Sequence, residues 1–93
     1  MKNQTHELKV WMDFWQDLTS GRKTFEVRKD DRGFNVGDTL ILKEWQPMLE
    51  RYTGKELVVT VTYLLPGGVF GIEPGYVVMS ISINQKTKEG KDQ

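Results

Sequence analysis

The sequence predicts a small α+β protein that is mainly β: a partly closed, mixed-to-antiparallel barrel of about five strands, with a short aromatic helix covering one opening. Three observations predict this class. The chain has 93 residues, enough for one domain with one modest core. Apolar residues alternate with polar residues in several short segments. Glycine and proline separate these segments, as they do in turns. We expect a single domain over residues 1–84 and a disordered tail over 85–93, which holds no apolar residue.

The first third of the chain contains the expected helix and the first strands. Residues 1–7 are polar, and we expect them to be loosely held until a short extended segment begins at Leu8. A helix of about two turns is predicted next, because apolar residues recur at the helical spacing: Trp11, Phe14, Trp15 and Leu18. Gly21 is placed where a left-handed C-terminal cap belongs. In the strand that follows, Phe25 and Val27 are expected to face the core, and Thr24, Glu26 and Arg28 the opposite side.

The remaining strands are predicted over 39–45, 56–65 and 76–84. Residues 46–54 are predicted to form a hairpin-like loop closed by Gly54, and residues 66–75 a glycine-rich loop. Both faces of the 56–65 segment are apolar or β-branched, so this strand is expected to be central. One face of it holds Leu57, Val59, Val61, Tyr63 and Leu65. The inward face of the last strand is expected to hold Val77, Met79, Ile81 and Ile83.

Composition limits the chemistry that is possible. There is no cysteine and only one histidine, His6, so thiolate and histidine-rich metal sites are excluded, and we expect no metal and no cofactor. No apolar run is long enough to span a membrane or to form a signal peptide, so we expect a soluble, cytoplasmic monomer with no membrane partner. Lys plus Arg equals Asp plus Glu at 13 each. This balance is not typical of proteins that coat nucleic acids non-specifically.

Charge is densest between Gly21 and Arg32. This stretch holds five cations (Arg22, Lys23, Arg28, Lys29 and Arg32) and three anions (Glu26, Asp30 and Asp31). Such a patch fits recognition of one small anionic group better than binding along a long backbone. A glutamate between Lys23 and Arg28 would stay ionised and fix both cations. The alternative is an ordinary solvated strand face with weak ion pairs.

These residues resemble a known family. Gly21-x-Lys23-x-x-Glu26-x-Arg28 is similar to the signature of the ASCH domain, a branch of the PUA-like superfamily. Flanking motifs resemble an uncharacterised subgroup of short bacterial and phage-associated proteins, and the resemblance covers about residues 6–84. These motifs are His6-Glu7-Leu8-Lys9, Asp31-Arg32, Val36-Gly37-Asp38, Glu44-Trp45, Tyr52-Thr53-Gly54 and Gly75-Tyr76-Val77-Val78.

The resemblance implies a PUA-like barrel with a cleft between the helix and the signature strand, where members bind RNA or modified nucleotides. Lys23 and Arg28 would hold phosphate, and Glu26 would accept hydrogen bonds from a base amino group. The candidates to stack a base are Trp45, Tyr76 and Trp11.

Two further residues have open roles in this interpretation. His6 either lines the cleft or is simply exposed. Arg32 is a further candidate for ligand contact, although pairing with Asp31 to lock the loop below the cleft is the favoured role. RNA or a nucleotide-like small molecule is therefore the expected partner.

Two alternatives stay open. Some ASCH proteins that resemble this one are amidohydrolases of N4-acylated cytidine, with a lysine matching Lys23 and a threonine nucleophile matching Glu26. This chain departs at Glu26, so an enzyme would need Thr24 as nucleophile or Glu26 as general base. It would also need a distant acid, for which Glu73 and Glu56 are candidates. Binding is therefore expected over catalysis. The other alternative is a phage or host protein-interaction module that docks a protein on the charged strand.

Overall fold

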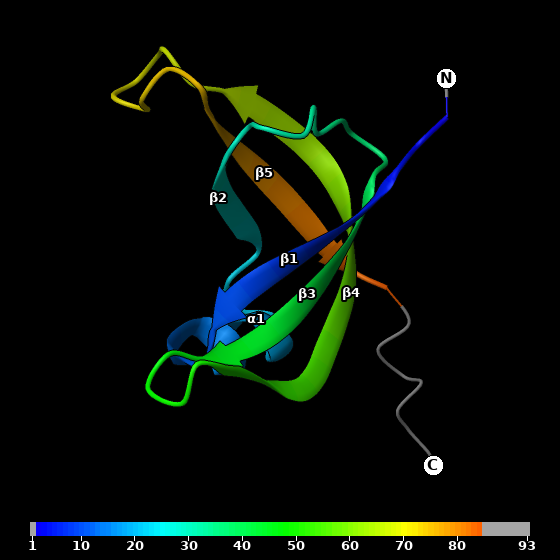
Figure 1. The fold of residues 1–93 in the computed structure, drawn as a ribbon. Coiled ribbons are helices and arrows are strands. Elements are labelled where there is room, and N and C mark those ends of the chain that lie inside the picture. The colour runs from blue at the N-terminus through cyan, green and yellow to red at the C-terminus, as the bar shows by residue number, and fades with distance from the viewer. Residues whose placement is uncertain (1, 85–93) are drawn as a thin grey trace.

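The computed structural model describes residues 2–84, in which five strands form one curled sheet beside a short helix (Figure 1). The expected class, a mainly β pseudo-barrel of five strands with a short helix, is confirmed. The expected C-terminal tail over 85–93 lies outside the described residues. No helix within residues 2–84 is both long and apolar enough to cross a bilayer. The strands are β1 (Thr5–Trp11), β2 (Phe25–Lys29), β3 (Thr39–Gln46), β4 (Arg51–Pro66) and β5 (Tyr76–Ile83).

The strands are arranged in the order β1-β3-β4-β5-β2. β1 runs parallel to β3, and the other neighbouring pairs are antiparallel, so the mixed sheet that we expected is present. β4 lies in the middle and is long and strongly curved (Figure 1). Its curvature brings the two outer strands, β1 and β2, to face each other across an open seam. A short 3-10 helix, η1 (Met12–Phe14), and α1 (Trp15–Thr19) connect these two strands.

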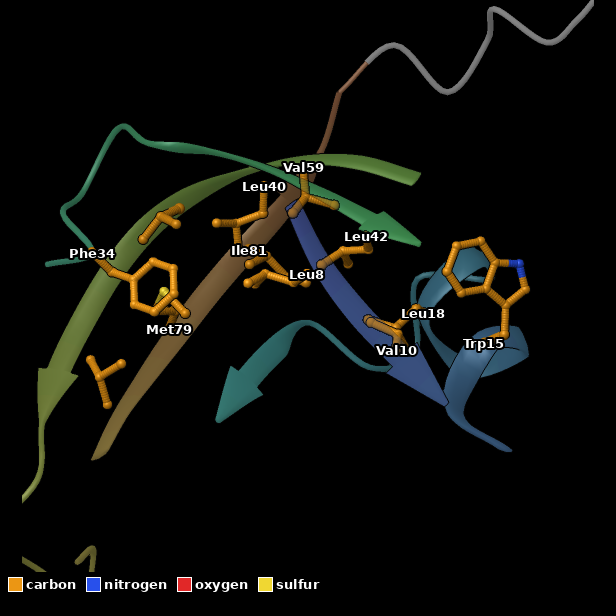
Figure 2. Packing of buried hydrophobic residues seen from close by; sticks show 12 residues of the cluster. Leu8, Val10, Trp15, Leu18, Phe34, Leu40, Leu42, Val59, Met79 and Ile81 are labelled. Atoms are coloured by element: carbon orange, nitrogen blue, oxygen red, sulfur yellow. The ribbon is translucent and has the colours of Figure 1, made fainter. Parts of the chain in front are cut away.

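The hydrophobic core fills the inside of the curled sheet. Figure 2 shows that Trp15 and Leu18 of α1 lie beside Val10 at one end, and that Phe34 lies near Met79 at the other. The inward face predicted for the last strand is confirmed, because Val77 and Met79 are fully buried and Ile81 nearly so. The remaining strand residues of the buried cluster come from β1, β3 and β4: Leu8, Val10, Leu40, Leu42, Val59 and Val61.

The expected orientation of β2 is wrong. Phe25 and Val27 are about half exposed (45% and 49%), whereas Glu26 is buried at 4%. The reason is the register with β5, in which Glu26 lies opposite Met79 and Val27 opposite Val78. Directly opposed residues share a face of the sheet, and β5 has the more apolar inward face. β5 therefore sets the orientation, and β2 turns Glu26 and Arg28 inward.

The expectations for the N-terminal segment and the helix also need correction. Residues 5–7 were expected to be loosely held, but β1 begins at Thr5 and pairs with β3 from there. The aromatic helical face is divided between elements, because Trp11 ends β1 and Phe14 belongs to η1; both are about half exposed. Only Trp15 and Leu18 of that face enter the core. Gly21 does take the predicted left-handed conformation, with φ +83°.

Two irregularities in β4 explain the remaining differences. The turn after β3 is shorter than predicted, because β4 begins at Arg51 and Gly54, at φ +97°, lies inside the strand. The ladder with β3 shifts at this point. The register of the β4–β5 pairing also shifts after Val61, and beyond this point the residues of β4 that faced the core face solvent and the reverse. Tyr63 is therefore exposed, and Leu64 rather than Leu65 packs against the core.

Candidate functional site

A cavity of about 530 Å³ lies in the seam between β1 and β2. Cavities of this size are typical of small-molecule sites, which span about 300–1,000 Å³. One wall is the end of β1 with η1, and the other is β2 with the residues before it. The lining residues are Lys9, Val10, Trp11, Phe14, Lys23, Phe25, Glu26, Val27 and Arg28.

Glu26 is held between two cations in this cavity. Its Oε2 atom lies 3.3 Å from Lys23 Nζ, and its Oε1 atom accepts a hydrogen bond of 3.1 Å from Arg28 Nε. The Glu26 side chain is 6% exposed, whereas the Lys23 and Arg28 side chains are 20% and 25% exposed. The structure thus brings together the three charged residues that the sequence singled out. The carboxylate is compensated on both sides, as a buried anion requires.

The loop before β2 positions Lys23. At φ +83°, Gly21 reverses the chain after α1, and the backbone N–H groups of Arg22 and Lys23 both donate to Asp17 O, at 3.0 and 2.8 Å. Lys23 Nζ donates to Phe25 O at 2.9 Å and lies 4.7 Å from the centre of the Phe25 ring. This ammonium group is therefore fixed at the mouth of the cavity by an anion, a carbonyl and an aromatic face.

Two arginines bridge the seam. Arg28 Nη2 donates to Lys9 O at 2.6 Å, and Arg32 Nη1 donates to Glu7 O at 2.8 Å. β1 bonds to β3 along its opposite edge, so these two carbonyls have no strand partner on the seam side. The guanidinium groups take the place of the missing ladder between β1 and β2. Arg32 also lies 3.9 Å from the exposed carboxylate of Asp31, its neighbour in the chain.

Aromatic side chains form the other part of the cavity. Trp11, Phe14 and Phe25 all line it and are each about half exposed. With Lys9, Lys23 and Arg28 against Glu26, the lining carries three cations and one anion, a net charge of +2. The arrangement offers flat apolar surfaces for a ring and positive charge for an anionic group.

Several predicted site residues lie outside this cavity. Thr24 is exposed and does not line it. Trp45 is half-buried on β3, where Lys9 Nζ lies 4.0 Å from the centre of its ring and Tyr52 packs edge-on against it. Tyr76 opposes Lys29 at the far end of β2. Of the three predicted stacking residues, only Trp11 therefore borders the cavity.

His6 belongs to a separate buried cluster. Its Nε2 atom lies 2.9 Å from Asp38 Oδ2, and its ring packs edge-on against Phe34, with the ring centres 4.8 Å apart. The alternative of an exposed histidine is wrong, because His6 is 6% exposed. It does not line the seam cavity either. This pair joins β1 to the turn before β3.

Asp38 collects the hydrogen bonds of that turn. Burial raises the pKa of its carboxyl, but hydrogen bonds from Gln4 N, His6 and Asn35 N outweigh burial, so the pKa lies below the ordinary 3.8. The ionised form is therefore favoured in the folded protein. No cluster of three or more His, Asp or Glu side chains among the described residues is arranged to hold a metal ion.

Sequence reasoning missed five lining residues: Lys9, Val10, Phe14, Phe25 and Val27. The last three were assigned to the core, and no local signal contradicts that choice. For Lys9 a signal existed, because strand alternation from Leu8 places Lys9 and Trp11 together on the face away from the core. Only the curvature of the sheet brings that edge next to β2.

Comparison with known proteins gives two matches. Residues 5–81 match the model of a family described as a domain of unknown function, DUF3850. A relative in Escherichia phage P2, described as an uncharacterized 12.9 kDa protein in the GpA 3′ region, is 36% identical over 62 residues. That alignment covers 67% of this chain and 55% of the phage protein, so the chain matches little more than half of this relative's length.

Proposed function

The chain belongs to the DUF3850 family of domains of unknown function, and for this member we propose that the seam cavity binds RNA or a nucleotide-like ligand. The observation that carries the proposal is the buried Glu26, held between Lys23 and Arg28 in a cavity with aromatic walls. A cytoplasmic location, where such ligands occur, is part of the same proposal.

Phosphate would bind at the two cations nearest the carboxylate. Arg28 uses its Nε and Nη2 donors for Glu26 and Lys9 O, but a guanidinium carries five N–H donors. The remaining donors are available to a phosphate oxygen. Lys23 Nζ lies at the mouth of the same cavity and adds a point charge. A single phosphate is thus a better match for this site than a long polyanion.

The base would bind between the carboxylate and the aromatic walls. Each carboxylate oxygen has two lone pairs, so Glu26 can accept a hydrogen bond from a base amino group while it keeps its contacts to Lys23 and Arg28. Trp11, Phe14 and Phe25 offer exposed ring surface for stacking. The resemblance to the ASCH domain belongs to this proposal, and it is supported by the fact that Lys23, Glu26 and Arg28 of the signature all line the cavity.

The hydrolase alternative is less well supported. Thr24, the proposed substitute nucleophile, does not line the cavity. Glu56 pairs instead with Lys43 at 3.8 Å, on the β3–β4 side of the sheet, and Glu73 is exposed in the loop before β5. Glu26, the possible general base, does lie beside Lys23, but neither candidate for the distant acid, Glu56 or Glu73, lines the cavity. The second candidate is instead a protein-interaction surface, because the apolar side chains of Phe25 and Val27 are about half exposed to solvent.

The test is a titration of the isotope-labelled protein with nucleoside 5′-monophosphates, nucleosides and N4-acetylcytidine, followed by amide chemical shifts. We expect shifts centred on residues 9–11 and 23–28. Lys23→Gln should weaken monophosphate binding about fivefold or more, because it removes a cation that is partly shielded from water. Lys55→Gln, an exposed cation outside the cavity, should leave binding unchanged.

Three outcomes would count against nucleotide binding. Absence of shifts with every ligand at millimolar concentration would contradict it. Equal losses in Lys23→Gln and Lys55→Gln would indicate non-specific electrostatics. Turnover of N4-acetylcytidine would favour the hydrolase.

A further inference from the structure

A second hollow adjoins the seam cavity. It measures about 320 Å³ and is lined by Asp17, Arg22, Lys23 and Phe25. Lys23 and Phe25 line both hollows, so the two hollows are neighbours that share these side chains. The second hollow adds Arg22, which follows Gly21 in the loop before β2, to the cations near the seam cavity.

Arg22 is well placed to receive a second anionic group. Its backbone is held by the hydrogen bond to Asp17 O at 3.0 Å, so the loop that carries it is fixed against α1. Its side chain is exposed and makes no ion pair with any residue of 2–84. Arg22 and Asp17 balance each other, so beyond the shared Lys23 the second hollow adds one cation and no net charge. Arg22 is therefore the group in this hollow that can pair with a second phosphate.

From this shared lining we propose that the ligand is a short single-stranded oligonucleotide rather than a free mononucleotide; this inference rests on the proposed function. One nucleotide occupies the seam cavity, and the next phosphate lies between Lys23 and Arg22 in the second hollow. Phe25 lines both hollows and offers its exposed ring to the neighbouring base. A double helix is not the ligand, because paired bases cannot reach aromatic walls inside a cavity.

The number of phosphates follows from the charges. The lining of the two hollows holds four cations, Lys9, Lys23, Arg28 and Arg22, against Glu26 and Asp17, a net charge of +2. A 5′-phosphate carries nearly two negative charges and the linking phosphate carries one, so two phosphates already compensate this charge, and a third would find no further cation in either lining. The site therefore fits two nucleotides, and longer strands should gain little.

The experiment compares a 5′-phosphorylated mononucleotide, dinucleotide and trinucleotide of the same base by calorimetry. We expect the dinucleotide to bind about fivefold or more tightly than the mononucleotide, through one added ion pair and one stacked base. The trinucleotide should bind within about twofold of the dinucleotide. The deoxyribose form of the dinucleotide, run in parallel, distinguishes an RNA source from a DNA source.

Arg22→Gln is the diagnostic variant, and Lys29→Gln, an exposed cation on β2 outside both hollows, is its matched control. Arg22→Gln should abolish the dinucleotide's advantage and leave mononucleotide affinity unchanged, while Lys29→Gln changes neither. Amide shifts at Gly21 and Arg22 should appear with the dinucleotide only.

The outcomes separate the two proposals. Mononucleotide binding that is lost in Lys23→Gln, with no gain for the dinucleotide, overturns the extended site and leaves the proposed function standing. A gain that survives Arg22→Gln also overturns the extended site. Absence of binding by all ligands overturns both proposals.

Discussion

Glu26 determines which side chains can surround it in the site, because a buried carboxylate needs neighbours that compensate its charge. An ionised group at 4% exposure needs charge and hydrogen-bond compensation, which Lys23 and Arg28 supply. The same pairing orders two long side chains that would otherwise be mobile at the surface. The cations are thus already oriented before a ligand arrives, which reduces the entropy lost on binding.

Asp38 has a structural role of the same kind, away from the cavity. Three groups, Gln4 N, His6 and Asn35 N, converge on its carboxylate and fix the turn before β3 against β1. Because β1 forms one wall of the cavity, this buried carboxylate supports the site without contacting a ligand. His6 therefore contributes through the fold, and a direct binding role for it is not part of our proposal.

The role of Asp38 predicts a pH-dependent stability. Its folded-state pKa lies below the ordinary 3.8, so its stabilisation is complete above pH about 4 and is lost as the pH falls through the folded value. Asp38→Asn should lower the free energy of unfolding at pH 7 by about 1.5–3 kcal/mol, since it removes charge-assisted hydrogen bonds. Urea denaturation of both proteins from pH 7 to pH 2 measures this difference.

The difference between wild type and Asp38→Asn should narrow below pH 4. A difference that stays constant down to pH 2 would show that the carboxylate charge is not what stabilises the turn. Asp31→Asn provides the control, because this exposed carboxylate makes only a long contact of 3.9 Å to Arg32. Its effect should stay within about 0.5 kcal/mol at each pH.

At the scale of elements, β2 is an edge strand that is paired on one side only. It bonds to β5, and across the seam Arg28 and Arg32 contact the carbonyls of Lys9 and Glu7. An unpaired strand edge is ordinarily available for pairing with another chain. Here the two arginines donate hydrogen bonds to carbonyls at the β1 edge, and the cavity lies in the space between the two strands. The barrel is therefore not closed between β1 and β2, and the cavity that we propose as the site lies in this open seam.

The seam predicts a measurable role for Arg32, which lies outside the cavity. Arg32→Gln should lower the free energy of unfolding by about 0.5–1.5 kcal/mol, because it removes the hydrogen bond to Glu7 O. Chemical denaturation measures the change, with Lys29→Gln as the control for loss of an exposed cation. An Arg32→Gln protein as stable as the control would show that the loop is held by other contacts.

At the scale of the whole molecule, charge is balanced while its distribution is uneven. The chain has 13 cations and 13 anions, yet the lining of the seam cavity alone has a net charge of +2. Long-range steering of a polyanion is therefore weak, and attraction is confined to the site. This distribution favours a ligand with few phosphates.

The salt dependence of binding tests this distribution. For single strands, the logarithm of the binding constant falls with the logarithm of salt concentration by about 0.7 per neutralised phosphate. One or two phosphates therefore predict a slope between about −0.7 and −1.4, measured by calorimetry between 50 and 300 mM salt. A slope steeper than about −3 would indicate a long strand bound across the surface.

The sequence by itself was sufficient for the class of fold and for three charged residues of the site. Alternation and turn residues identified the strands, because both depend on neighbours along the chain. β5 was predicted correctly for this reason, since its apolar residues at Val77, Met79 and Ile81 keep a regular period of two. The pairing of Glu26 with Lys23 and Arg28 was also accessible, because each of the two cations is within three positions of Glu26 in the chain.

Only the tertiary structure decided which way β2 faces and what lines the cavity. Its alternation is equally compatible with either orientation, and the register with β5 selects the one that buries Glu26. The faces of β4 likewise exchange at a bulge that local periodicity does not reveal. Lys9 joins the site from β1, far from β2 along the chain. Its placement depends on the curvature of the whole sheet, which no short stretch of sequence specifies.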